Sequence, residues 1–162
     1  MSDWGVDYDE DGIEAEPIDV DEETGEVTGD VDESAAPETP PLYYGSVDEF
    51  VRKHLRYVYR RRIAGDGRSR VWAAEWWRYA EAVSRLDSLW RAWEHLRLDA
   101  STGMSVWWRD HADHHMPILL DPDGPFAGAE GELNSSKRGE PLPYAPPPEG
   151  LFPDVRETAG TD

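Results

Sequence analysis

Apolar positions between residues 47 and 63 recur at intervals of three and four, the period of an α-helix with one buried face. They are Val47, Phe50, Val51, Leu55 and Val58, and His54 and Arg62 share their spacing. Ser46 and Glu49 have the spacing of a capping box, in which the Ser46 hydroxyl accepts from the Glu49 amide and the Glu49 side chain from the Ser46 amide. Gly65 and the turn after it supply a stop. The sequence predicts a helix from 47 to about 63.

A second amphipathic pattern extends from residue 71 to residue 97, with charged residues on its opposite side. Its apolar members are Val71, Trp72, Trp76, Trp77, Tyr79, Ala82, Val83, Leu86, Leu89, Trp90, Trp93 and Leu96. Aromatic residues at helical spacing indicate a core. Trp76 and Trp77 are adjacent and cannot both face inward, so a platform that stacks on a ligand or base is the alternative for one of them. The pattern does not decide between one helix and two.

The segment SVWWRDHADHHM, residues 105–116, predicts a third helix. Ser105 suits the N-cap position, and Pro117 disfavours helix at the residue before it, so the helix is expected to end at Met116. These three helices predict an all-α fold, a small three-helix domain at residues 42–126.

The charge of the chain lies in its N-terminal part. The whole chain has a formal net charge of -19. Residues 1–49 hold 18 Asp or Glu and no Lys or Arg, which leaves 17 acids and 16 bases for the rest. We therefore expect an acidic disordered tail at residues 1–41 and a second, Pro- and Gly-rich disordered tail at residues 127–162.

Composition limits the kinds of covalent and metal site that the protein can contain and the cellular location expected for it. The chain has no Cys, which excludes disulfides and thiolate metal sites. The acidic beginning MSDWGVDYDEDG is unlike a secretory signal, and no apolar run reaches the roughly 18 residues of a membrane span. The sequence predicts a soluble cytoplasmic protein with no membrane partner.

A basic stripe runs along and just beyond the first predicted helix. It consists of Arg52, Lys53, Arg56, Arg60, Arg61, Arg62, Arg68 and Arg70, with Asp66 as the only acid between them. Such a density of like charge calls for a counter-charge, supplied by nucleic-acid phosphate, by the acidic tail or by bulk ions. Tyr57 and Tyr59 lie among the bases and either stack on a nucleobase or pack in the core. The stripe predicts contact with nucleic acid, and a merely solvated helix face is the alternative.

A histidine cluster at the end of the third predicted helix has metal-ligand spacing. His111 and His115 lie four residues apart, so both imidazoles can reach one divalent metal, with Asp110 or Asp113 as a further ligand. His114 belongs to the same candidate metal set. His114 and Asp110 have the same spacing and suit a proton-transfer pair. The cluster lacks an HExxH motif, so a structural role is the alternative and the sequence requires no cofactor.

Three blocks carry a resemblance to a known family. They are the run Leu86 to Asp99, which reads LxSLWRAWEHLRLD with Asp87 in the second place, GMSVWWRDHADHH at 103–115 and LLDPDGPF at 119–126. They resemble an actinobacterial domain of unknown function, DUF4913, whose members are commonly encoded on integrated plasmids, conjugative elements and phages. The resemblance covers about half the chain and assigns no catalytic residue.

The sequence thus favours a non-enzymatic accessory protein of a mobile element. It would contact nucleic acid or a DNA-processing partner through the basic stripe, modulated by the acidic tail. The alternative is a helical adaptor that binds only protein through exposed Trp and the acidic tail. A third hypothesis is a metal-dependent enzyme that uses the histidine cluster.

Overall fold

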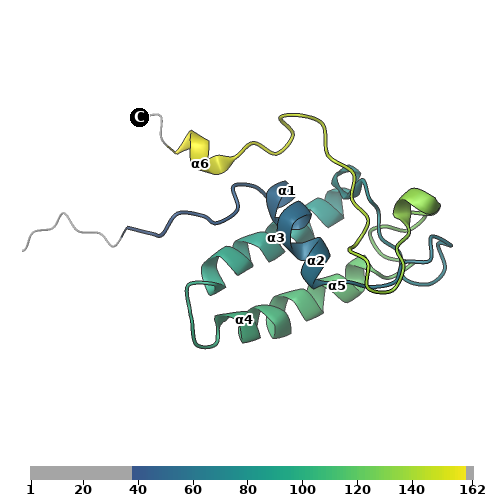
Figure 1. The fold of residues 1–162 in the computed structure, drawn as a ribbon, viewed down its shortest axis with the longest axis horizontal. Helices are drawn as coiled ribbons and strands as arrows, with labels where there is room; N and C mark the ends of the chain where they lie inside the picture. The colour runs from purple at the N-terminus through teal and green to yellow at the C-terminus, as the bar shows by residue number, and fades with distance from the viewer. Residues whose placement is uncertain (1–37, 160–162) are drawn as a thin grey trace, which may run out of the picture. The chain divides into compact units, whose positions relative to one another are not determined.

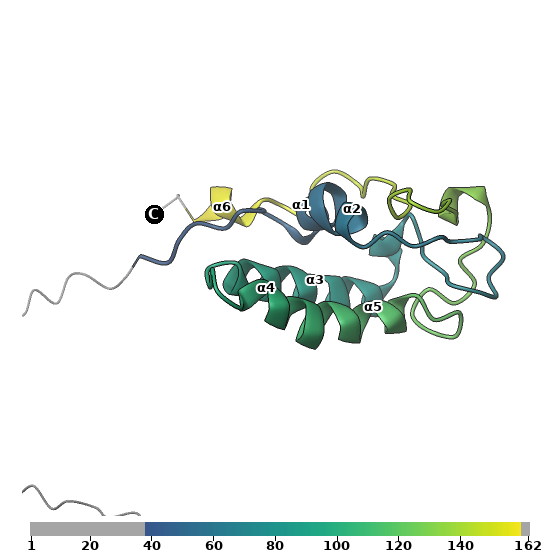
Figure 2. The same ribbon diagram turned by 60° about the horizontal axis from the view of Figure 1, so that its bottom comes forward.

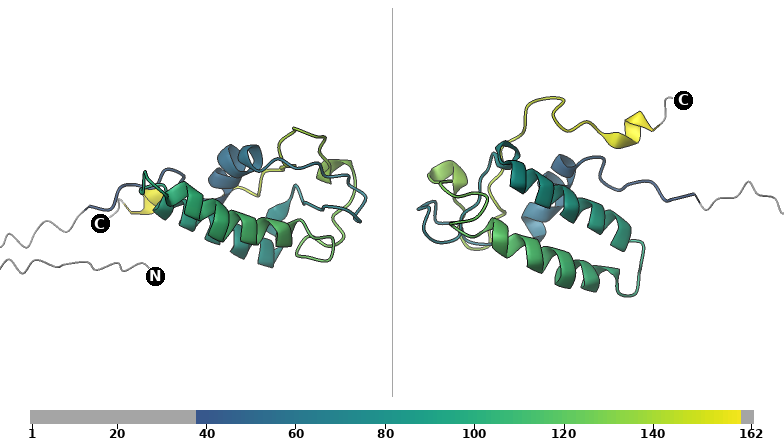
Figure 3. Two further views of the ribbon diagram at one scale, coloured as in Figure 1. Left: turned by 90° about the horizontal axis from the view of Figure 1, so that it is seen from below. Right: turned by 180° about the vertical axis from the view of Figure 1, so that it is seen from behind.

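The computed structural model describes residues 38–159, and these residues are all-α, as the sequence predicts (Figure 1). The longest helix is α3 (Ala80–Leu96). A second long rod lies antiparallel beside it, and α4 (Gly103–Val106), η3 (Trp107–Ala112) and α5 (Asp113–Leu119) follow one another without a break along this rod. Figure 3 shows the pair side by side from two further directions. The remaining segments lie over one face of this pair and beyond one of its ends (Figure 2).

The first predicted helix lies over the pair (Figure 2) and is formed by α1 (Val47–Phe50), η1 (Val51–Leu55) and α2 (Arg56–Val58). Its N-cap is confirmed, because the Glu49 amide donates to the Ser46 hydroxyl at 3.1 Å. The reciprocal bond of the capping box differs, since the Glu49 carboxylate accepts from the amide of Gly45 at 2.7 Å.

This helix ends at Val58, earlier than the predicted end near residue 63. Tyr59 leaves the helical region with φ -110° and ψ 68°. Its ring is buried and stacks on Trp108 at 6.1 Å between centroids. Ile63 is also buried and pairs through its backbone with Ser136. Both residues thus reach the core from irregular backbone, whereas Val58 and Arg62, on which the longer helix was predicted, are exposed.

The segment 71–97 is not one helix. Val71, Trp72, Ala73 and Ala74 are buried one after another, a pattern that a helix with one buried face cannot provide. They form an irregular stretch that leads through the 3₁₀ turn η2 (Trp76–Arg78) into α3. The amphipathic stripe of α3 itself is confirmed, with Ala82, Leu86, Leu89 and Trp90 buried.

The third predicted helix is longer at both ends than the sequence indicated. It begins at Gly103, where a side-chain Cβ would collide with the Leu96 carbonyl oxygen, so the tight turn between the two rods needs a glycine. It continues through Pro117 to Leu119. Pro117 and Asp113 are both exposed, and Pro117 removes only the N–H that would reach the Asp113 carbonyl. Water can solvate that carbonyl, so the predicted stop at Met116 is wrong.

The predicted disordered tail from residue 127 is corrected by the packing of residues 127–159. Leu142 is fully buried, and its amide donates to the Arg56 carbonyl at 3.1 Å. The Trp72 indole donates to the Pro143 carbonyl at 2.9 Å. The amide of Ala145 donates to the Ala74 carbonyl at 2.9 Å. The sequence of this segment has no helical or strand periodicity, and it was predicted to be disordered. Its backbone groups are nevertheless paired with the Trp72 indole and with backbone groups of residues 42–126.

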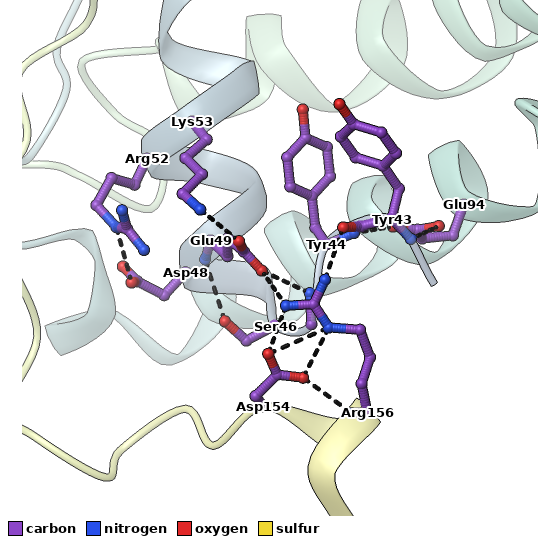
Figure 4. Close-up of polar contacts among 11 residues, drawn as sticks. Tyr43, Tyr44, Ser46, Asp48, Glu49, Arg52, Lys53, Glu94, Asp154 and Arg156 are labelled. Atoms are coloured by element: carbon purple, nitrogen blue, oxygen red, sulfur yellow. Dashed lines mark hydrogen bonds and ion pairs between the residues drawn. The ribbon is translucent and has the colours of Figure 1, made fainter. Parts of the chain in front are cut away.

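The C-terminal end is held at the start of the first helix (Figure 4). Phe152 stacks on Trp76 at 5.2 Å between centroids. Arg156, in α6 (Val155–Thr158), donates to the Tyr43 carbonyl at 2.8 Å and pairs with Glu49 at 3.0 Å. Burial alone would raise the pKa of Glu49, but its bonds to Lys53 and the backbone, with the nearby positive charges, lower it.

Near the start of the described chain, Tyr43 and Tyr44 lie beside the C-terminal end of α3 (Figure 4). The amides of Tyr43 and Tyr44 donate to the buried Glu94 carboxylate at 3.0 and 2.7 Å, and Arg97 pairs with the same carboxylate at 2.8 Å. The predicted disorder of residues 1–41 falls mostly outside the described residues. None of the helices between residues 38 and 159 has the length and apolar character needed to cross a membrane.

Because Leu142 is fully buried, replacing it with Ala is expected to lower the free energy of unfolding by about 2–5 kcal/mol, through lost burial and the cavity left behind. The matched control is Leu133→Ala, since Leu133 is 61% exposed and its loss should change stability by no more than about 0.5 kcal/mol. Urea unfolding followed by tryptophan fluorescence measures both. Equal effects of the two substitutions would show that residues 127–159 do not belong to the folded unit.

Candidate nucleic-acid interface

In the structure, the side chains of the predicted basic stripe fall into groups that differ in what they contact. Arg52 and Lys53, on the first helix, face acids one turn earlier (Figure 4). The Arg52–Asp48 distance is 3.5 Å and the Lys53–Glu49 distance is 2.6 Å. Both pairs are partly exposed, so they contribute little to stability, but they offset the positive charge at this end of the helix.

The middle of the stripe is engaged in the fold. Arg56 donates from Nε to the Leu142 carbonyl at 2.9 Å, and Arg60 donates from Nη1 to the Gly139 carbonyl at 2.9 Å. The guanidinium of Arg61 lies 4.1 Å from the centroid of the Tyr59 ring, a cation–π contact. Arg56 and Arg60 therefore hold the C-terminal segment against the first helix, a role that the sequence did not predict.

The last part of the stripe lines a hollow of about 420 Å³. Its walls carry Arg62 and Arg70 from the stripe, Arg138 from the C-terminal segment, and Ala64 and Ser69. Within residues 38–159, no acid lines this hollow. Among residues 38–159, no carboxylate pairs with these three arginines and no side-chain hydrogen bond engages them. We call it the basic hollow.

A second hollow, of about 600 Å³, shares Arg62, Ala64 and Arg138 with the basic hollow. Its other lining residues are Ile63, Glu132, Ser135, Ser136, Lys137 and Glu140. It therefore presents carboxylates, hydroxyls and cations together, and we call it the mixed hollow. The two hollows lie next to each other, with Arg62 and Arg138 in the wall between them.

Backbone contacts fix this wall. Ile63 and Ser136 exchange amide-to-carbonyl bonds of 3.0 and 2.9 Å, and the Ser136 hydroxyl donates to the Arg61 carbonyl at 2.9 Å. Beyond this bridge, the Gly131 amide donates to the Gly65 carbonyl at 2.9 Å. Gly65 has φ +72° and lies so near this stretch of backbone that a Cβ would meet the Gly131 oxygen at 2.7 Å. The arginines are thus carried by a backbone frame that is already in place.

The one acid of the stripe is directed into its own turn. The Asp66 carboxylate accepts from the amides of Arg68 and Ser69, at 3.0 and 3.2 Å, and from the Ser69 hydroxyl. The two backbone bonds are the main reason that the pKa of Asp66 is lowered. The carboxylate orders the loop between Arg62 and Arg70 and does not line the basic hollow.

Arg138 is the residue that sequence reasoning missed. It lies in a Ser-Ser-Lys-Arg run at 135–138, where two adjacent bases stand out in an otherwise acidic segment. That contrast was the only available signal. The pairing of Arg138 with Arg62 depends on the Ile63–Ser136 bridge, which no local pattern indicates.

The family profile described as "Domain of unknown function (DUF4913)" matches residues 44–148, more than half of the chain. The chain belongs to this family. Neither the comparison with curated proteins nor the comparison with solved structures found a match. The matched range of the DUF4913 domain extends beyond residue 126 and includes every residue that lines the two hollows.

The histidine cluster of the DUF4913 domain does not converge on a metal position. No group of three or more His, Asp or Glu side chains within residues 38–159 is arranged to hold a metal ion. Asp110 bonds its neighbour Arg109 at 2.7 Å. His115 Nδ1 lies 3.1 Å from Arg85 Nη1, and arginine only donates, so Nδ1 is the acceptor. Burial and the nearby Arg85 charge lower the pKa of His115. His111 and His114 remain predicted ligands without a supporting arrangement.

The other candidate stacking residues are used by the fold. Trp76 is buried beneath Phe152, and the Trp77 indole donates to the Ala145 carbonyl at 3.3 Å. Tyr59 is buried, whereas Tyr57 is 44% exposed and remains the aromatic residue of the stripe that a nucleobase can reach.

His54 lies in an aromatic cluster, 4.9 Å from Trp93 and 5.5 Å from Phe50 between ring centroids. Burial lowers its pKa. The unfolded chain, with a His pKa of about 6.5, then binds a proton at a higher pH than the folded protein does. The stability that results from this difference is fully present above about pH 6.5, and it is lost as the pH falls toward the lower pKa of His54 in the folded protein.

We therefore expect the melting temperature to fall between about pH 6.5 and pH 5, and to fall less in His54→Phe, which keeps an aromatic ring at this position. Calorimetry at several pH values measures the slope. His115→Gln should remove a further part of it, since the pKa of His115 is also lowered. An unchanged slope in the His54→Phe protein would contradict this account.

Proposed function

We propose that the protein is a nucleic-acid-binding module and that the basic hollow is its phosphate contact. One observation supports this most strongly. Arg62 and Arg70 come from one loop and Arg138 from the C-terminal segment. The three arginines line one hollow, and none of them pairs with a carboxylate among residues 38–159. Guanidinium groups bind phosphate oxygens through paired donors, which makes arginine the preferred residue for such contacts.

The electrostatic cost of the arrangement favours an anionic ligand. Three like charges around one hollow repel each other, and none of the three forms an ion pair within residues 38–159, unlike Arg52 and Lys53. A phosphate in the hollow removes the repulsion and releases counterions, which drives association at low salt. This contact recognises the phosphate backbone of nucleic acid and does not distinguish one base sequence from another.

The contact surface is therefore the end of the predicted stripe together with one new residue. Arg62, Arg68 and Arg70 are exposed. Arg138 joins them from the C-terminal segment. Arg56 and Arg60 contribute by holding that segment in place. The proposed interface is thus narrower than the whole stripe and depends on tertiary structure.

The biological setting of the proposal follows from the family resemblance. A DUF4913 protein encoded on an actinobacterial plasmid, conjugative element or phage would act in the cytoplasm on the element's own DNA or beside a DNA-processing protein. The protein would be an accessory factor, without catalytic residues of its own.

The two alternatives find less support in the described residues. None of the seven tryptophans between residues 38 and 159 is exposed, so an adaptor that binds protein through exposed Trp would have to use other side chains. The metal-dependent enzyme lacks a clustered ligand set in the same residues. A pull-down from lysate that survives nuclease treatment would favour the adaptor.

Replacing Arg62, Arg70 and Arg138 together by Ala is expected to weaken binding to a short DNA by tenfold or more at about 50 mM salt, because each phosphate contact adds to affinity at low salt. Fluorescence anisotropy across salt concentrations should also show a shallower salt dependence, by about one unit of slope for each phosphate that is no longer neutralised. The matched control is Arg91→Ala, since Arg91 is exposed on α3 but already paired with Asp87 at 2.8 Å. Absence of nucleic-acid binding by the unmodified protein would end the proposal.

The acidic N-terminal segment supplies the second test. Residues 1–38 contain 16 Asp or Glu and no Lys or Arg, so they can compete electrostatically for the same arginines. Removing them, which leaves the compact unit Thr39–Asp162, is expected to raise DNA affinity at low salt, and the gain should vanish as salt screens the charges. Circular dichroism of the shortened protein must retain the helical signal. Equal affinities of the two proteins at low salt would remove the acidic segment from the mechanism.

A further inference from the structure

The two hollows differ in charge although they share a wall. The basic hollow presents only cations and the Ser69 hydroxyl. The mixed hollow is also lined by Glu132 and Glu140. A ligand that spans both must be strongly anionic at one end and must offer neutral hydrogen-bond donors at the other.

This charge pattern limits how a nucleic-acid strand can lie. The mixed hollow holds the carboxylates of Glu132 and Glu140 beside its cations. A strand that passed through both hollows would therefore bring a second phosphate next to two like charges that the basic hollow lacks. A strand that ends at the wall has no such conflict. Its terminal phosphate occupies the basic hollow, while the sugar hydroxyls and base edge of the last nucleotide face the carboxylates and serines of the mixed hollow.

Shape leads to the same conclusion. Duplex DNA presents its phosphates on a convex rod, so a flat or gently curved basic surface is sufficient to bind it. The basic hollow has a volume of about 420 Å³ and the mixed hollow about 600 Å³. Both values lie within the range of small-molecule sites, which suits a single nucleotide unit that projects from its strand.

The charge of the phosphate adds a third argument. A phosphate within a strand carries one negative charge, whereas a terminal phosphate with a second pKa near 6 carries about −1.5 to −2 at neutral pH. Arg62, Arg70 and Arg138 together match the terminal group better. The Ile63–Ser136 bridge and the Gly131–Gly65 bond hold the segments that carry Arg62 and Arg138, so little ordering is needed on binding.

We propose that this site binds the phosphorylated end of a single nucleic-acid strand, with the terminal phosphate in the basic hollow and its nucleotide in the mixed hollow. This inference rests on the proposed nucleic-acid function and specifies its ligand. The exposed Tyr57 ring lies on the helix that leads into Arg60, whose Nη1 bonds Gly139 beside Arg138. It provides a surface for a base further along the strand.

The test compares oligonucleotides of one sequence that differ at the end: 5′-phosphate, 3′-phosphate, no terminal phosphate, and the blunt duplex without terminal phosphate. Anisotropy is measured with the full chain and, in parallel, with residues 39–162. We expect one phosphorylated single strand to bind about tenfold more tightly than the unphosphorylated strand, the increment of a charge-assisted contact. Inorganic phosphate and a mononucleotide serve as competitors, and both should compete only at much higher concentrations.

Variants identify the hollow that is responsible. Arg138→Ala and Arg70→Ala should abolish the preference for the phosphorylated end, while Arg91→Ala should keep it. Glu140→Gln should leave the end preference but improve binding of strands that extend past the site, because the repelling carboxylate is gone.

Equal binding of phosphorylated and unphosphorylated strands, with nucleic-acid binding otherwise intact, would overturn the end-recognition inference and leave the proposed function standing. Failure of both proteins to bind any of the four oligonucleotides would instead overturn the proposed function. Competition by the mononucleotide at the same concentration as the phosphorylated strand would show a free-nucleotide site and would also overturn the inference.

Discussion

The packing of the C-terminal segment against the helices is the constraint on which the rest of the structure depends. Leu142 fills the core, and the Trp72 indole donates to the next carbonyl, that of Pro143. A buried indole N–H without an acceptor would cost about 1–3 kcal/mol, so the proline-rich segment satisfies a donor that the helices alone leave open. It also closes the core over Trp72. The domain is therefore incomplete without this segment.

The same packing creates the proposed site. Arg138 is four residues before Leu142, and Arg56 and Arg60 hold the backbone between the two positions through their bonds to Leu142 and Gly139. The basic stripe thus serves two purposes at different positions. Its middle members position the C-terminal segment, and the segment in turn brings a third arginine to Arg62 and Arg70. An anion bound at the proposed site would for this reason also stabilise the fold.

The hydrophobic periodicity of the sequence correctly predicted the elements that form regular helices with one buried face. The capped start at Ser46 and the apolar stripe of α3 follow from such patterns. Periodicity failed where irregular backbone is buried. Val58 and Arg62 continue the helical spacing but are exposed, whereas Tyr59, Ile63 and residues 71–74 are buried outside a helix. Pro117 was predicted to end a helix, yet its missing donor falls on an exposed side.

Only part of the proposed site could be predicted from the sequence. Arg62 and Arg70 were found because basic residues are dense around them. Arg138 was missed because its partner is 76 positions away and the bridge between Ile63 and Ser136 depends on neither periodicity nor composition. Charge density identifies where cations are numerous, whereas only tertiary contacts separate the cations that are already engaged from those that remain available. In this DUF4913 protein the densest part of the stripe is largely engaged, and the available charge lies at its end, where two distant segments meet.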